Sequence, residues 1–170
     1  VNPASIQTTS LAVTASSISL SSGAQITSAS LGNIAASDIS LVFSDLLRMR
    51  NAAISTTAQE GDGGAVSIQG GRGILLDRSQ ITTSVLGANN GNGGNIAIRA
   101  SALASNSGFI QANTEALASG GSITVDSLVF VPSGSQVSIG GNTPFIFQPD
   151  AFGFNVIQAA APQGNPGNVG

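Results

Sequence analysis

The stretch GANNGNGGNIAIRASA, residues 87–102, joins a run of Asn and Gly directly to an alternating Ile-x-Ile segment. Ile96 and Ile98 share one face of an extended chain and the residues between and beside them share the other, as in a β-strand. The same join recurs as GGAVSIQ, starting at Gly63, and as GGSITVD, starting at Gly120. The recurrence indicates a repeated strand, and the Gly-Gly pair turns the chain before each copy.

A second set of apolar residues, beside Ser- and Thr-rich segments, repeats at a nearly constant interval. Its members are Ile26, Ile54, Ile81, Ile110 and Val137. The spacings between successive members are 28, 27, 29 and 27. A third apolar segment lies between the two sets, as GILLD at 73–77 and as SLVFV at 127–131. Each period of this length therefore contains three short strands separated by turns.

Three strands per period predict an all-β fold, a single-stranded parallel β-helix (solenoid) of about six coils. No coil can bury its apolar face alone, so the second set should stack as one inward file of side chains. Residues 44–53 have a helix-like pattern, but Leu46 and Leu47 fall where the ILL of GILLD falls in the next repeat. We therefore predict a strand there.

We expect one β-helix domain over residues 1–170, a fragment of a longer protein. Residues 1–44 form less regular N-terminal coils, 45–140 regular coils, and 141–170 an irregular C-terminal coil. The spacing is only 20 from Ile6 to Ile26 and again from Val137 to Ile157, although IQA at 157–159 echoes IQA at 110–112. PGNVG at the end of the chain resembles the start of a GGNI strand, which favours a solenoid that continues beyond Gly170.

The alignment of the repeats places Gln69, Arg99 and Asp126 at one position of successive coils. Arg99 and Asp126 should then form an outward ion pair worth a few tenths to about 1 kcal/mol. Five of the seven Phe residues lie near the C-terminus, where they could fill or cap the core or form an exposed patch. We favour core filling. These residues are Phe130, Phe145, Phe147, Phe152 and Phe154.

The composition excludes several classes of function. Charged residues make up 8% of the chain, which has five Arg, no Lys and a net charge of −3, so no basic stripe is present for nucleic acid. Cys, His, Trp and Tyr are absent, which excludes disulfides, imidazole catalysis and the common zinc and haem ligand sets. No apolar run reaches the ~20 residues of a membrane-spanning helix, and the N-terminus shows no signal peptide.

Candidate sites for chemistry are weak. The carboxylates of Asp62, Asp77, Asp126 and Glu115 form no pair suited to glycoside hydrolysis, so we predict no catalytic residues. NNGNGGN at 89–95 and EGDGGA at 60–65 lack the Asp of a calcium-binding repeat, so we interpret them as turns and expect no metal or cofactor. Outward Ser, Thr, Gln and Asn could bind glycans or only solvate the surface. PDAFGF at 149–154 could be a partner surface, although a coil-closing insertion is favoured.

Three segments resemble the filamentous haemagglutinin-like exoproteins of two-partner secretion systems, in particular their C-terminal repeats. They are ISTTAQEGDGGAVSIQ at 54–69, SQITTSVLGANNGNGGNIAI at 79–98, and TPFIF with NVIQAAAPQGNPGNV at 143–147 and 155–169. The resemblance covers most of residues 45–170. It implies a right-handed parallel β-helix, export through an outer-membrane β-barrel partner of a Gram-negative bacterium, and a role in adhesion at the cell surface.

The family's secretion domain carries an Asn-Pro-Asn-Gly motif, and only VNPASI, residues 1–6, stands here. We therefore expect a stalk or distal repeat. The hypothesis is a non-enzymatic, structural and adhesive segment of a secreted or cell-surface adhesin, with the secretion transporter and a glycan or protein receptor as partners. The alternatives are a glycan-binding module and a polysaccharide-active β-helix enzyme.

Overall fold

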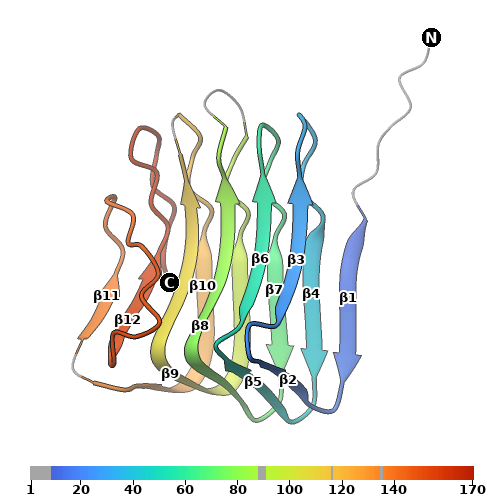
Figure 1. The fold of residues 1–170 in the computed structure, drawn as a ribbon, viewed down its shortest axis with the longest axis vertical. Helices are drawn as coiled ribbons and strands as arrows, with labels where there is room; N and C mark the ends of the chain where they lie inside the picture. The colour runs from blue at the N-terminus through green and yellow to red at the C-terminus, as the bar shows by residue number, and fades with distance from the viewer. Residues whose placement is uncertain (1–8, 88–90, 116, 135) are drawn as a thin grey trace.

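The computed structural model describes residues 9–87, 91–115, 117–134 and 136–170. Within these ranges the chain forms twelve β-strands and no helix, so no helix there could cross a membrane. All the paired strands run parallel, and they stand side by side in stacked turns (Figure 1). This is a parallel β-helix, as predicted.

Three columns of strands enclose the core. The first column holds β1 (Ser10–Ala15), β4 (Asp38–Phe43), β7 (Val66–Gly70) and the starts of β9 (Ile96–Thr114) and β10 (Ile123–Pro132). The second holds β2 (Ile18–Ser21), β5 (Leu46–Arg50), the start of β8 (Gly73–Val85), the middle of β9 and the end of β10. The third holds β3 (Gln25–Ser30), β6 (Ala53–Ala58), the ends of β8 and β9, β12 (Phe154–Gln158) and β11 (Gln136–Ile139).

The core consists of inward files of aliphatic side chains, one residue from each coil. In the third column Ile26, Ile54, Ile81 and Ile110 lie in register, as predicted. In the other columns the files are Ile39, Val66, Ile96 and Ile123, and Ile18, Leu47, Ile74 and Leu103. These side chains are buried apart from Ile26, which is half-buried at the N-terminal end of its file. Burial of such files between neighbouring coils is the main stabilising contribution in a solenoid.

The predicted strand within residues 44–53 is confirmed, since β5 occupies its centre. The solenoid has about four turns rather than the six that we expected. The difference arises partly because residues 136–153 form an excursion within one coil, not a turn of their own. Ile6 lies outside the described residues. The N-terminal strands β1 and β3 nevertheless stack in full register on β4 and β6.

The prediction for Val137 is wrong. Ile157 of β12 lies beside Ile110, and Val137 of β11 lies one strand further out, beside Asn155. The spacing from Ile110 to Ile157 is 47, longer than one period, because the chain forms β11 before it returns to the open position on β9. The echo of IQA is therefore a true structural repeat. Likewise Val169, in the final PGNVG, forms a parallel bridge with Ile123.

The C-terminal aromatic residues mostly pack outside the tube, so the core-filling prediction fails for them. Ile110 faces the core, which directs its neighbour Phe109 to the outer face of the third column. There Phe109 makes edge-on contacts with Phe147 and Phe154, with ring centroids 5.1 and 5.6 Å apart. Phe145 packs on Phe154 in the same way, and Phe152 is exposed. Of the five, Phe130 packs against the core cluster.

Candidate functional site

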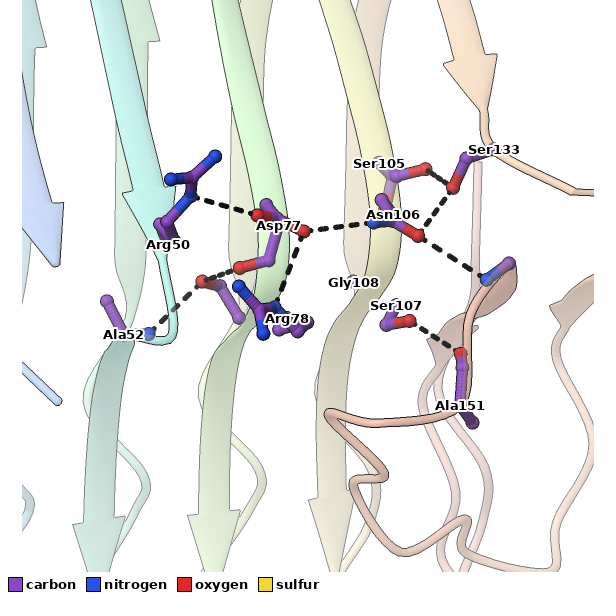
Figure 2. Close-up of polar contacts among 12 residues, drawn as sticks. Arg50, Ala52, Asp77, Arg78, Ser105, Asn106, Ser107, Gly108, Ser133 and Ala151 are labelled. Atoms are coloured by element: carbon purple, nitrogen blue, oxygen red, sulfur yellow. Dashed lines mark hydrogen bonds and ion pairs between the residues drawn. The ribbon is translucent and has the colours of Figure 1, made fainter. Parts of the chain in front are cut away.

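A ladder of polar side chains crosses four successive coils at the corner between the second and third columns (Figure 2). Arg50 donates to Asp77 over 3.1 Å, and Asn106 donates to the other oxygen of Asp77 over 2.9 Å. The Ser133 hydroxyl then donates to Asn106 over 2.8 Å. Strand register causes this order, because Arg50, Asp77 and Asn106 occupy the same outward position on β5, β8 and β9. Each rung therefore ties one coil to the next.

Asp77, a candidate carboxylate from the sequence, lies at the centre of this ladder. Its side chain is only 18% exposed, and Arg78 adds a third contact at 3.7 Å. Its backbone carbonyl accepts from the Ser79 hydroxyl, which in turn accepts from the amide of Ala52 (Figure 2). Both carboxylate oxygens of Asp77 are therefore engaged in contacts that tie this corner to the neighbouring coils.

Four of the five arginines lie on or beside two neighbouring strands of the second column, β5 and the start of β8. We call them the arginine face; they are Arg48, Arg50, Arg72 and Arg78. Two carboxylates, Asp45 and Asp77, pair with three of them, so the face carries four positive and two negative charges in a chain of net charge −3. Sequence reasoning missed this grouping, because it depends on how the coils stack.

Arg48 differs from the other arginines. In the part of the chain that the structure describes, it is the one arginine without an ion-paired carboxylate. It stands between Ser19 and Leu75 on the neighbouring coils, beside a shallow groove. The groove is lined by Ser19, Ser21, Arg48, Arg50, Leu75 and Asp77. A guanidinium with free donors beside hydroxyls can receive a carboxylate or a similar anion.

The predicted ion pair between Arg99 and Asp126 is confirmed. The two residues lie in register on β9 and β10, and the Arg99 Nε is 2.9 Å from the Asp126 Oδ2. Gln69 occupies the same position on β7, as the alignment predicted. Both charged side chains are more than half exposed, so the pair contributes little to stability. A second shallow groove runs past the pair on the first column.

The remaining candidate carboxylates do not converge. Asp62 accepts the backbone amide of Asn92 over 2.7 Å, and Asp126 is engaged with Arg99. Among the described residues no three His, Cys, Asp or Glu side chains are grouped as metal ligands. Of the two turns considered for calcium, residues 89 and 90 lie outside the described ranges. Asn95 caps the next coil instead, because its side chain accepts the amide of Ser122 over 2.8 Å.

A buried polar anchor at β12 was not foreseen. Asn155 accepts from the Ser105 hydroxyl at 2.8 Å and from the Gly108 amide at 3.1 Å. It donates to the carbonyls of Ser133 and Gly153. The side chain is almost fully buried, so these bonds fix where β12 enters the third column. The sequence signal for this anchor was weak. It consisted of the position of Asn155 close before the repeated IQA, with Val156 between them.

Residues 149–154, which we considered as a partner surface, are part of the excursion that leads into β12. The backbone carbonyl of Ala151 accepts a hydrogen bond from the Ser107 hydroxyl (Figure 2). Phe154 is the first residue of β12. This arrangement fits the favoured prediction of an insertion that closes the coil. Phe152 projects from it into solvent.

Comparison with protein-family models, with curated proteins and with solved structures found no match to this chain.

Proposed function

We propose that the chain is a non-enzymatic structural and adhesive segment of a secreted or cell-surface haemagglutinin-like adhesin, exported by two-partner secretion. The observation that carries this proposal is the register of the inward Ile file, which persists through every coil of the third column up to β12. Such a stack makes a rod whose strength comes from many equivalent contacts between neighbours. The family and its export route rest on the sequence motifs 54–69, 79–98 and 143–147 with 155–169.

The polar groups of the chain also fit a structural role. Arg50, Asp77, Asn106 and Ser133 are used to join coils, and no buried side-chain nitrogen or oxygen of the described residues lacks a hydrogen-bond partner. A chain without Cys can also be exported unfolded without disulfide rearrangement.

The export part of the proposal is tested by expressing the full chain with its native flanking sequence in a Gram-negative host. We expect the protein at the cell surface or in the medium only when a two-partner outer-membrane transporter from the same genome is co-expressed. Accumulation in the periplasm regardless of the transporter would contradict the export route. An assay for reducing or unsaturated sugars on acidic polysaccharides should show no product.

A glycan-binding module is the second candidate, and the arginine face is the observation that favours it. Arg48 offers free donors beside the hydroxyls of Ser19 and Ser21, which suits the carboxylate of an acidic sugar. On a glycan array, binding of acidic glycans that falls several-fold with Arg48→Ala would support this candidate. Arg72→Ala removes the same charge from an arginine already paired with Asp45 and is the matched control. Equal loss in both variants would indicate unspecific charge attraction instead.

A further inference from the structure

Two strands of the C-terminal segment enter the third column through the same kind of corner. A residue with left-handed backbone precedes each earlier strand of this column: Ser22, Asn51, Arg78 and Ser107, with φ between 48 and 56°. Gly134 precedes β11 and Gly153 precedes β12, with φ of 75 and 74°. Both segments therefore have the backbone turn of a third-column strand.

By spacing, β11 is the better continuation of the solenoid. Val137 follows its corner residue Gly134 at the third position, as Ile110 follows Ser107, whereas Ile157 follows Gly153 at the fourth, a spacing found elsewhere in this column between Ser22 and Ile26. The spacing from Ile110 to Val137 is 27, which is one period, and the spacing from Ile110 to Ile157 is 47. Nothing in the length of the chain would prevent β11 from lying directly on β9.

Judged by its contacts, however, β12 fits the position beside β9 better than β11 does. Ile157 is 7% exposed in its position on β9, whereas Ile139 of β11 is 62% exposed one strand further out. The four hydrogen bonds of Asn155 hold the entry of β12. The backbones of the two corners are in close contact, because a Cβ added to Gly134 would lie 2.7 Å from the Cα of Gly153. Larger residues at these corners would keep the two strands apart.

We propose that β11 and β12 are alternative occupants of one position, the open side of β9 in the third column. β11 is made first along the chain and closes the third column, with Val137 on Ile110 and Ile139 on Ala112. β12 then displaces it to the outer position seen here, and β11 returns whenever β12 is withdrawn. One strand thus always covers the open side of β9. β11 covers it while the residues after β11 are not yet in place, and again when they are pulled away from the solenoid. The exchange does not depend on the proposed family or its export route.

The chain has no Cys, so pairs of introduced Cys can report the two arrangements. In the structure Ser138 lies beside Val156, and Gln111 lies beside Gln158, two strands away from β11. The pair Ser138→Cys with Val156→Cys should therefore form a disulfide in the arrangement seen here. The pair Gln111→Cys with Ser138→Cys is beyond the ~7 Å reach of a disulfide here but would be adjacent after exchange.

Both Cys pairs are placed in the full chain, with and without Ile157→Asp, which makes β12 unable to occupy the core. We expect Ile157→Asp to raise the Gln111–Ser138 disulfide at least about tenfold and to lower the Ser138–Val156 disulfide, because the populations shift between two arrangements. The β-sheet circular dichroism should persist. Asn155→Ala should act in the same direction, more weakly, whereas Asn95→Ala, which removes a cap in the first column, should have no effect on either pair.

The control for unfolding adds Ile139→Asp to Ile157→Asp. After exchange Ile139 would face the core, so this second change should abolish the Gln111–Ser138 disulfide, while a disordered chain would cross-link regardless of residue 139. Three results would overturn the proposal: no rise in the Gln111–Ser138 disulfide with Ile157→Asp, an equal rise with Ile139→Asp added, or loss of the β-sheet signal with Ile157→Asp alone.

Discussion

The ring of Phe43 lies directly over Gly70 on the next coil of the first column. The two residues are in register on β4 and β7, and a Cβ added to Gly70 would meet the ring at 2.0 Å. Phe43 is nearly fully buried, so it fills the volume that the missing side chain leaves. This position differs from the aliphatic files, because the large ring of Phe43 lies between two small residues, Ala15 on the preceding coil and Gly70 on the next.

Gly70→Ala should therefore lower the free energy of unfolding by about 1–3 kcal/mol, because the added methyl overpacks the ring. Phe43→Leu in the same chain should recover part of this loss. Gly32→Ala, at a glycine with no atom within 4 Å of the added methyl, is the matched control. Urea denaturation of the four proteins measures the effect, and equal stability of Gly70→Ala and Gly32→Ala would show that the contact is wrong.

Ile81→Asp should destabilise the protein by several kcal/mol, because the side chain is fully buried between Ile54 and Ile110 and a carboxylate there has no partner. Ile146→Asp makes the same change at a side chain that is 82% exposed and should be nearly neutral. Thermal melting followed by circular dichroism compares the two. A variant Ile81→Asp that keeps the parent melting temperature would mean that residue 81 does not face the core.

The Arg99–Asp126 pair should show a coupling energy of about 0.2–1 kcal/mol in a double-mutant cycle with Ala. Since both side chains are largely exposed, the coupling should shrink as salt is raised from low to molar concentration. The measurement is the free energy of unfolding of the four proteins at two salt concentrations. A coupling near zero at low salt would place the two side chains out of reach in solution.

Thr83 and Thr82 allow a comparison within one strand. The buried hydroxyl of Thr83 donates to the carbonyl of Gly94 over 2.6 Å, and Thr56 makes the same bond to Gly64 one coil earlier. Thr83→Val should cost about 1–3 kcal/mol, because it leaves this buried carbonyl without its donor. Thr82→Val, on the outward side of the same strand, should cost little. Equal urea midpoints for the two variants would argue against the inward hydroxyl.

Much of this fold could be predicted from periodicity. The intervals between Ile26, Ile54, Ile81 and Ile110 are set by coil length, and coil length alone fixes which residues stack. The Arg99–Asp126 pair follows from the same register. Local patterns sufficed in these coils because each residue's neighbours are one period away and the corners have nearly constant length.

The alignment by one period misplaced Val137, because spacing alone cannot distinguish two strands that compete for one position beside β9. β11 has the correct interval and the correct alternation, yet β12 has the buried anchor Asn155 and the aromatic contacts to Phe109. These contacts join residues much further apart in the chain than one period, and a one-period alignment does not include them. The arginine face was missed for a similar reason, since it depends on side chains from adjacent coils and from a corner.

The stacking of the inward Ile side chains is tested most directly by a nuclear Overhauser spectrum of the full chain with labelled Ile and Val methyl groups. The stacked inward file predicts a chain of methyl contacts from Ile26 through Ile54, Ile81 and Ile110 to Ile157. Contacts of Ile110 with Val137 in place of Ile157, or contacts that do not link residues one coil apart, would contradict it.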